Sequence, residues 1–573
     1  MTLLDWLVLI STIGCIVGYG MWKSRGAQDA AGYLRGGNEA RWPTIGLSIM
    51  ATQASAITFL SMPGKAYEDG LRFVQFYFGM PLAVIFICIF LVPIYYRLQV
   101  FTAYEYLEQR FDRRTRQLGA LFFLLQRGLQ AGISIYAPAI ILSALFDWSL
   151  TLMTIIIGLV VIVYTVSGGT KAVSQTQKQQ MVVIMMGMVI TALIIIDKVT
   201  DQVSLNEALS IAGALGRMEV VDFTFDLHNR YTVWTGLLGG FFLALSYFGT
   251  DQSQVQRYLS GRSLTESRLG LLFNGLLKVP MQFFILMIGV LLFVFYVLNP
   301  APVTFNGPAY QQALTTEAQT RLTALNQHHT RLDESRRRWA LSYVEALREN
   351  DSAVARDARR KLKLSNEVVT KIRAQVRDTV TRAVPKAPKQ DYDYIFIHFV
   401  LAFLPAGLVG LLVAVILSAA MSSTASELNA LGTTMSVDFY KTSWRPQADD
   451  AQMVRASKGF TILWGVIAIG FALLTSLFDN LIELINILGS LFYGTVLGVF
   501  LVGFFATRIK AQAVFWGAIC SELLVLALYS FGRAGYIPEI GYLWFNVLGC
   551  VFVAIIGALW QVALPSRVTR RSS

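Results

Sequence analysis

Residues Ile49 to Gly64 read IMATQASAITFLSMPG, and residues Leu417 to Tyr440 read LSAAMSSTASELNALGTTMSVDFY. Both stretches belong to apolar regions, yet small and hydroxyl-bearing residues crowd them. Polar groups inside a membrane are costly, so they face a cavity or another helix. Close helix packing would also select small residues, whose hydroxyls can bond back to their own helix. Two such stretches in one chain favour a site for a hard cation, built from carbonyl oxygens of a locally unwound helix and from serine hydroxyls.

The composition is that of a protein that crosses a membrane many times. The chain has 573 residues, of which 55% are hydrophobic and 15% charged, whereas soluble domains carry about 25% charged residues. This composition does not fit a soluble enzyme, a disordered chain or a secreted disulfide scaffold. The apolar runs are long and unbroken rather than alternating, which also argues against a β-barrel.

The apolar runs predict an all-α membrane protein with about 13 transmembrane helices. The runs fall near residues 3–22, 42–63, 71–96, 117–145, 150–167, 180–197, 232–252, 270–298, 393–421, 455–477, 480–507, 511–531 and 541–563. Basic residues gather in alternate loops, such as 23–41 and 97–116, and in the tail 567–571. By the positive-inside rule, the N-terminus lies outside and the C-terminus in the cytoplasm of a plasma (inner) membrane. The net charge of +12 is spread over these loops, so it does not indicate nucleic-acid binding.

Residues 299–392 interrupt the apolar pattern, because they are polar and strongly charged. Ala313–Leu347 and Ser352–Ala383 carry Leu, Ala and Val at helical spacing and few helix breakers. We therefore expect two long antiparallel helices on the extracytoplasmic side. The chain is then divided into transmembrane segments 1–298 and 393–573, with the hairpin 299–392 inserted between them.

Several motifs resemble those of the sodium:solute symporter family, which includes sodium/glucose, iodide, multivitamin, monocarboxylate and bacterial sialic-acid symporters. In order along the chain they read ATQASAITF, GLRFVQFYFG, YYRLQVFTAYEYLEQRF, IYAPAIIL, SYFGTDQSQVQRY and SSTASELNALGTTMSVDFY. The resemblance covers nearly the whole chain except 299–392. It implies a LeuT-type core of two inverted five-helix repeats, formed by spans two to six and seven to eleven, with one span before the core and two after it.

The resemblance also implies a sodium site between the first and eighth core helices, built from backbone carbonyls and two hydroxyls. The matching residues are Ala51, Ala54, Ala419, Ser422 and Ser423. Some family members bind a second sodium ion with further serines and an aspartate on the fifth core helix. At those positions this chain has Ala425, Ser426 and Gln177. A neutral amide offsets the charge of a cation poorly, so we expect one coupled sodium ion rather than two.

For the solute, the resemblance implies a binding set and an aromatic gate. The binding set is Ser55, Thr58, Phe73, Tyr77 and Gln130, and the gate is Tyr247 and Phe248. Sialic-acid symporters have an arginine where Gln130 stands, so a direct salt bridge to a solute carboxylate is absent at that position. Arg127 and Lys278 either reach the cavity or extend toward the membrane surface. The uncharged polar set favours a polyhydroxylated or neutral solute.

The predicted function is secondary active transport, in which a sodium ion drives the symport of a small polar solute by alternating access. The solute would be a sugar, a sugar acid or another small organic molecule, and the other expected partner is the lipid bilayer. The alternative is a transporter-like sensor that uses the hairpin 299–392 to dock an external protein. Enzymatic activity is not expected, because no set of His, Cys and carboxylate residues has catalytic spacing.

Overall fold

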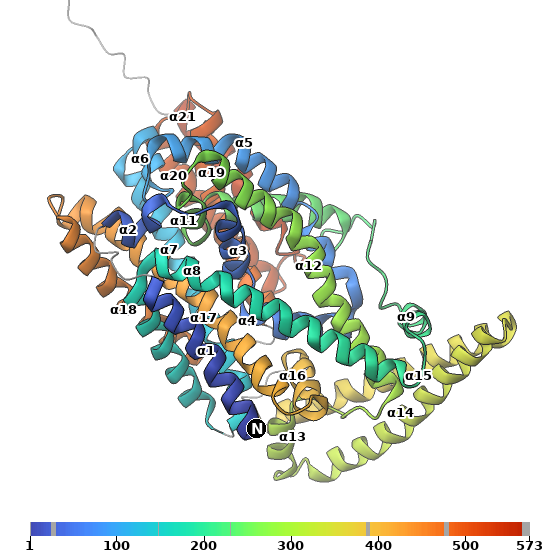
Figure 1. Cartoon of the computed structure of the whole chain (residues 1–573). Coiled ribbons are helices and arrows are strands. Elements are labelled where there is room, and N and C mark those ends of the chain that lie inside the picture. Colours follow the sequence, from blue (N-terminus) through green and yellow to red (C-terminus); the bar gives the residue numbers. More distant parts are fainter. Residues whose placement is uncertain are drawn as a thin grey trace, which may run out of the picture.

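The protein is a bundle of long helices in a computed structural model that describes residues 2–23, 30–146, 148–229, 231–385, 390–474 and 481–563 (Figure 1). Within these ranges the only extended pairing is an isolated bridge between Ala40 and Gly261. The helices before the insertion are α1 (Leu3–Lys23), α2 (Ala30–Arg35), η1 (Gly36–Asn38), α3 (Trp42–Gln53), α4 (Ala56–Asp69), η2 (Gly70–Tyr77), α5 (Met80–Leu98), α6 (Glu105–Arg110), α7 (Arg113–Phe146), α8 (Leu150–Thr200), α9 (Leu205–Ala214), η3 (Thr235–Gly239), α10 (Gly240–Gly249), α11 (Gln252–Leu259) and α12 (Leu264–Leu298). The remaining helices are α13 (Gly307–Leu314), α14 (Gln319–Arg348), α15 (Ser352–Ala383), α16 (Tyr392–Phe403), α17 (Leu408–Thr434), η4 (Met435–Trp444), α18 (Asp450–Leu474), α19 (Leu481–Phe505), α20 (Ala511–Arg533) and α21 (Trp544–Ala563).

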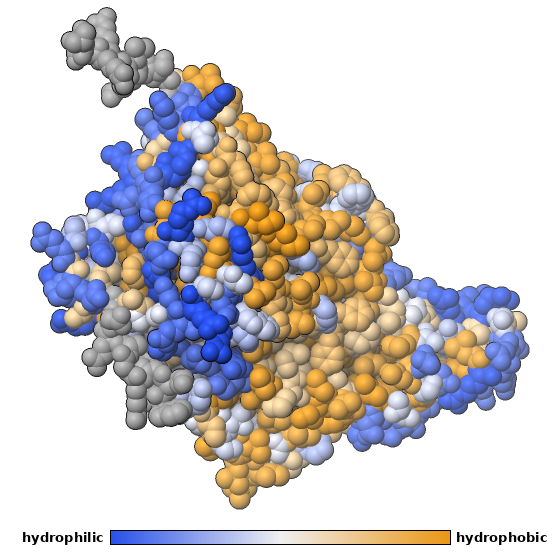
Figure 2. Space-filling model, turned by 45° about the horizontal axis from the view of Figure 1, so that its top comes forward, coloured by the Kyte–Doolittle hydropathy of each residue, from blue (hydrophilic) through white to orange (hydrophobic). Residues whose placement is uncertain are grey.

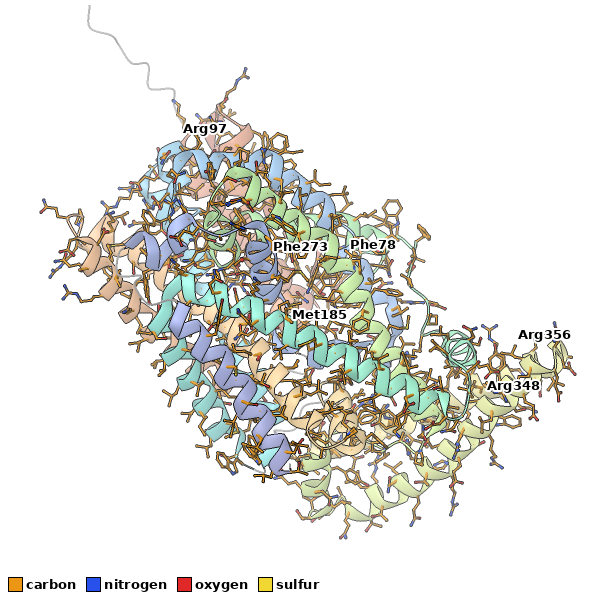
Figure 3. All side chains as sticks on the ribbon, in the orientation of Figure 1. Phe78, Arg97, Met185, Phe273, Arg348 and Arg356 are labelled. Carbon is orange, nitrogen blue, oxygen red and sulfur yellow. The ribbon has the colours of Figure 1, made fainter. Side chains whose placement is uncertain are left out.

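On the face shown in Figure 2, a wide apolar belt lies between two polar regions of the molecule. Side chains in this belt remain exposed, including Val163 on α8 at 70% and Leu559 on α21 at 64%. Arg97 lies at one end of the molecule and Arg348 at the other, with Phe273 between them (Figure 3). Nine described helical segments are long and apolar enough to cross a membrane. These features confirm the predicted all-α membrane architecture.

The predicted runs 150–167 and 180–197 both lie within α8, which changes direction at Gly169. Gly169 has a φ of 57°, a conformation that residues with a side chain rarely adopt. A Cβ atom at this position would also come within 2.6 Å of the Tyr33 ring. The kink therefore separates two runs without a conventional loop between them.

The predicted ninth span, 393–421, is wrong as a single helix. The chain forms α16, turns at Leu404–Gly407, and only then enters α17, which with η4 forms the segment long enough to cross a membrane. Pro405 and the positive φ of 89° at Gly407 interrupt the helix. The turn is fixed by Asp5 of α1, whose carboxylate accepts the Gly407 amide at 2.6 Å. Apolarity continues through the turn, so hydropathy alone joins the two helices.

Two helices that enter the middle of the bundle are interrupted, and they are the ones expected to open the two repeats. The first interruption lies at Ala54 and Ser55, between α3 and α4. The second lies at Thr250 and Asp251, between α10 and α11. Each break leaves backbone groups without their usual helical partners at the centre of the protein.

The insertion forms a helical hairpin in which α14 packs along α15 and projects away from the bundle (Figure 1). Its base is attached to the membrane helices by buried polar contacts. Arg373 of α15 contacts Glu68 of α4 and Asp391, each at 3.3 Å. Arg336 of α14 donates to the Tyr296 carbonyl at the end of α12 at 2.8 Å. The predicted pair of long helices is therefore present, although the first begins at Gln319 rather than at Ala313.

Candidate functional site

A cavity lies beside the first helix break, and both helices of that break contribute to its wall. It holds about 660 Å³ of space between atoms, part of it open to solvent. The lining residues come from α3, α4, η2, α7, α10, α17 and α19. They are Thr52, Gln53, Ser55, Thr58, Phe76, Tyr77, Arg127, Gln130, Leu243, Tyr247, Glu427, Ile485, Asn486, Gly489 and Tyr493.

Oxygen atoms from α3 and α17 meet next to this cavity. The Ser422 hydroxyl donates to the Ala51 carbonyl at 3.0 Å, although these residues are 371 positions apart in the chain. One residue further along α17, the Ser423 hydroxyl donates to the Ala419 carbonyl, also at 3.0 Å. All four residues are buried. Hydroxyl and carbonyl oxygens of this kind are the neutral ligands that suit an alkali cation.

The helix geometry explains why carbonyl oxygens are available at this place. Ala54 ends α3 with a ψ of 76°, and Ser55 continues in extended conformation with a ψ of 172°. The last carbonyls of a helix have no amide donors one turn ahead. The break thus exposes the carbonyl end of α3 opposite the hydroxyl face of α17.

Gln177 of α8 lies between the same two helices and binds both. Its amide nitrogen donates to the Ser422 carbonyl at 3.0 Å, the Ser426 hydroxyl at 2.6 Å and the Thr52 hydroxyl at 3.1 Å. Its carbonyl oxygen accepts a hydrogen bond from Ser48. The amide therefore directs hydrogen atoms toward the oxygens that a second cation would need. Ser426 and Gln177, which the sequence places together only through the family resemblance, are in direct contact.

Four of the five predicted solute-binding residues border the cavity, and one aromatic residue, Phe73, does not. Ser55, Thr58, Tyr77 and Gln130 line it, whereas Phe73 lies behind the wall, with its ring centre 6.1 Å from that of Tyr77. Phe76, three residues later, takes part in the lining instead.

Of the two residues of the predicted aromatic gate, one lines the cavity and the other does not. Tyr247 lines the cavity, and Phe248 is buried beside it with a distance of 4.9 Å between ring centres. Gln130 is held in place from across the cavity, because its amide donates to the Ile485 carbonyl of α19 at 2.8 Å.

Arg127 does not extend toward the membrane surface but lies buried in the cavity wall at 3% exposure. Its guanidinium forms ion pairs with Asp251 at the second helix break and with Glu427 of α17, the latter at 3.1 Å. The same group donates to the Tyr493 hydroxyl at 2.7 Å. Four separate helical segments thus converge on one guanidinium.

Lys278 of α12 is also buried, but it does not line the cavity. Its ammonium lies 5.6 Å from the centre of the Tyr77 ring, so Tyr77 stands between it and the cavity. Within the described part of the chain, Nζ of Lys278 has no hydrogen-bond partner. It therefore neither reaches the solute cavity nor extends to the membrane surface.

The sequence reasoning missed the contributions of α19 and the role of Glu427. Asn486 and Gly489 interrupt the apolar run of α19, which is a signal that this helix borders a cavity. Glu427 is an acidic residue in the middle of a predicted span, and such a residue marks a functional position by default. Asp251 gave the same signal, but its partner Arg127 could not be inferred from sequence spacing.

Two interrupted helices that meet a central polar cavity inside an apolar bundle define a membrane transporter of the LeuT type. A sequence model of the "Sodium:solute symporter family" matches residues 33–327 and 374–521. The chain belongs to the sodium:solute symporter family. The interval between the two matched regions, 328–373, lies within the hairpin and holds parts of α14 and α15.

The relatives include transporters of several kinds. The human sodium/iodide cotransporter is 34% identical over 293 residues, which are 51% of this chain and 44% of that protein. The mouse sodium-coupled monocarboxylate transporter 2 is 27% identical over 84% of this chain, and the match spans 64% of that protein. The matched regions thus span about half to two thirds of these relatives. The sodium/sialic acid symporter NanT of Aliivibrio fischeri is 24% identical over 97% of this chain and 92% of its own length.

A solved structure supports the fold along the whole chain. It shows a substrate-bound, outward-open state of a Na⁺-coupled sialic acid symporter. The TM-score is 0.76 at 22% sequence identity, and the match covers 98% of each chain. The predicted LeuT-type architecture is therefore confirmed.

Proposed function

We propose that this protein is a sodium-coupled symporter that moves a small polar solute across the plasma membrane by alternating access. The observation that carries the proposal is the contact between the Ala51 carbonyl and the Ser422 hydroxyl at the first helix break. It brings a backbone oxygen from one repeat to a hydroxyl oxygen from the other, beside the central cavity. The sodium ligands would be oxygens of Ala51, Ala54, Ala419, Ser422 and Ser423.

A sodium ion at this position would hold α3 against α17 and thereby shape the neighbouring cavity. Ser55 and Thr58 follow the break directly and line that cavity, so ion binding and solute binding share one segment of backbone. The membrane potential supplies about 2.3 kcal/mol per charge for each 100 mV. The Gln177 amide supports a stoichiometry of one sodium ion, since its hydrogen atoms occupy the oxygens of Thr52, Ser422 and Ser426.

An ion pair between α4 and α19 could act as a gate on one side of the cavity. Lys65 of α4 contacts Glu483 of α19 at 3.0 Å and Asp69 at 2.7 Å. With the N-terminus outside and the C-terminus in the cytoplasm, as the basic loops indicate, this pair lies on the outer side. The basic tail 567–571 is outside the described residues. Opening and closing of this contact would expose and cover the solute.

The hairpin 299–392 would form an extracytoplasmic unit between the transmembrane segments 1–298 and 393–573. Its Arg373 contacts Glu68 of α4, and its Arg348 contacts Glu207 of α9 at 2.7 Å. These contacts support a role of the hairpin as an accessory to transport rather than as a detached sensor. Shortening the distal half of the hairpin, while leaving Arg336 and Arg373 in place, should leave sodium binding unchanged.

Sodium binding can be tested without knowing the solute. Sodium chloride should raise the melting temperature of the purified protein in detergent, and potassium or choline chloride should not. Ser423→Ala should weaken the apparent sodium affinity roughly tenfold, because one ligand oxygen is lost. Ser436→Ala is the matched control, since Ser436 is also buried and bonds back to its own helix, at the Gly432 carbonyl. Equal stabilisation by potassium, or an unchanged sodium affinity in Ser423→Ala, would contradict the proposal.

A further inference from the structure

The charge of the cavity wall is set by the cluster of Arg127, Asp251, Glu427 and Tyr493. Arg127 donates to Asp251, to the Tyr493 hydroxyl at 2.7 Å and to Glu427 at 3.1 Å. The Tyr493 hydroxyl in turn donates to Asp251 at 2.9 Å. One guanidinium therefore faces two carboxyl groups, and when both are ionised the cluster carries one net negative charge.

Both carboxylate oxygens of Asp251 have hydrogen-bond partners, whereas only one of the two Glu427 oxygens has one. One oxygen of Asp251 accepts from the Ser253 amide at 2.9 Å and from the Ser253 hydroxyl at 2.7 Å, and the other contacts Arg127. Glu427 binds Arg127 through Oε1 only. The Ser134 hydroxyl interacts with this carboxyl group, but no hydrogen bond of ordinary geometry reaches Oε2 within the described residues, although the side chain is 3% exposed and lines the cavity. A buried carboxylate oxygen without a donor is costly, so a donor from the cavity would satisfy it.

Aromatic rings supply a second, independent feature of the same cavity. Phe76, Tyr77, Tyr247 and Tyr493 all line it, and they come from three different helical segments. The Arg127 guanidinium already lies 5.4 Å from the centre of the Tyr247 ring. Aromatic faces combined with a carboxylate favour cations, because the ring quadrupole and the negative charge act in the same direction.

The other charged groups near the cavity do not offset the carboxyl groups of this cluster. On the side of α4, Lys65 contacts the two carboxylates of Asp69 and Glu483. Lys278 is separated from the cavity by the Tyr77 ring. The strongest argument for an anionic solute is the Nε of Arg127, which is buried without a partner among the described residues. An anion bound there would lie next to Asp251 and Glu427, whose charges would repel it.

We propose that Glu427 Oε2 receives the protonated amino group of the solute, and that the solute is therefore a small polar amine, such as an amino sugar or an amino alcohol. The ammonium group would donate to Oε2 and lie against the aromatic rings, while Ser55, Thr58 and Gln130 bind its hydroxyl groups. This inference rests on the proposed transport function and specifies its solute class. It differs from what the names of the relatives indicate for those proteins, since iodide, monocarboxylates and sialic acid are anions.

The test compares solutes that share a frame and differ in one group. Glucosamine, glucose and glucuronate share a sugar ring, and ethanolamine, ethylene glycol and glycolate share a two-carbon frame. Each is added to the purified full-length protein in sodium chloride, and the shift in melting temperature is recorded. Within at least one series, the amine should give the largest shift. If the alcohol or the carboxylate gives the larger shift in both series, or if neither amine gives a shift, the inference is overturned.

Variants then assign the preference to Glu427. Glu427→Gln should weaken the apparent affinity for the amine roughly ten- to a hundredfold, because it removes a charge-assisted hydrogen bond. Glu522→Gln is the matched control, since Glu522 is a buried glutamate on α20 that does not line the cavity. Unchanged amine binding in Glu427→Gln would contradict the assignment. Should that variant fold poorly, Tyr77→Leu should reduce the amine shift while Tyr77→Phe preserves it.

The stabilisation by sodium alone distinguishes a failure of the proposed solute class from a failure of the proposed transport function. If sodium chloride alone stabilises the wild-type protein and Glu427→Gln alike, the sodium site stands whatever the amines do. If the amines then show no preference, only the solute class is refuted. If sodium has no effect of its own, the proposed transport function fails before the solute question arises.

Discussion

The two helix breaks at the centre of the protein differ in how their backbone is held. At the first break, between α3 and α4, the residue that precedes α4 is Ser55, which makes no side-chain cap, and the Ala51 carbonyl accepts a hydrogen bond from the neutral Ser422 hydroxyl. At the second, between α10 and α11, Asp251 caps α11 through the Ser253 amide and forms an ion pair with Arg127. One break presents neutral oxygens, and the other is closed by charged side chains.

This difference indicates a division of labour between two segments that occupy equivalent places in the repeats. An alkali ion that must bind and leave needs several neutral oxygens rather than a strong permanent partner. A buried ion pair, by contrast, is expensive to break and fixes one geometry. We therefore expect substitutions at the second break to affect folding most, and substitutions around the first break to affect sodium binding most.

The largest effect is expected for Asp251→Asn. The substitution leaves Arg127 with one carboxylate instead of two and weakens the cap of α11. Because Arg127 keeps Glu427 as a partner, no buried charge is left uncompensated, and the free energy of unfolding in denaturant should fall by about 1–3 kcal/mol for the lost charged hydrogen bonds. The loss should appear without sodium as well as with it.

A double variant sharpens this prediction. Arg127→Gln alone leaves the Asp251 carboxylate without its guanidinium partner, and the added Asp251→Asn removes that unpaired carboxylate. The double variant should be more stable than the sum of the single effects by roughly 0.5–3 kcal/mol. Strictly additive losses would mean that the two residues are not coupled and that the second break is not held by this pair.

The sequence alone predicted those features that can be recognised from residues adjacent in the chain. Ser422 and Ser423 stand out because hydroxyls are rare in an apolar run, and the hairpin stands out because its charge differs from its surroundings. The turn at Pro405 and Gly407 was missed, because hydropathy averages over a short break in an apolar stretch. Phe73 was assigned to the lining, but on a helical segment a shift of a few residues decides which side chain faces a cavity.

The charged cluster could not be predicted, because its members are far apart in sequence. Arg127 lies 124 residues from Asp251 and 300 residues from Glu427. Each charge is visible as an anomaly within a predicted span, but only the folded chain shows which of them neutralise one another. The placement of one guanidinium between two carboxyl groups, on which the solute class depends, is therefore visible only in the structure.

Gln177→Asp adds negative charge beside the first break. We expect it to increase sodium binding, an effect smaller than the loss of stability expected for Asp251→Asn. The amide hydrogens that now bind Ser422, Ser426 and Thr52 would be replaced by carboxylate oxygens. A second sodium ion should then bind, so the Hill coefficient for sodium should rise from about one toward two, and the apparent affinity should increase roughly tenfold. Direct binding of radioactive sodium to the purified protein measures both quantities.

Gln177→Asn is the control for this variant, because asparagine has the size of aspartate but no charge. It should show no gain in sodium binding. If aspartate and asparagine behave alike, charge at this position does not determine the number of sodium ions, and the explanation for a single coupled ion is wrong.

The smallest effect is expected for Thr52→Val, which tests how far the sodium site extends along α3. The Thr52 hydroxyl donates to the Ser48 carbonyl of its own helix at 2.8 Å and lies 3.0 Å from the Ser426 hydroxyl, whereas Ser422 is bonded to Ala51. Valine has nearly the same shape, so the variant should lose about 1 kcal/mol of stability for the missing hydrogen bonds. Its sodium affinity should remain within roughly twofold of the wild-type value, well under the change expected for Ser423→Ala. A loss of sodium affinity as large as that of Ser423→Ala would place Thr52 among the ligands and move the ion away from Ala51, toward the oxygens that Gln177 now occupies.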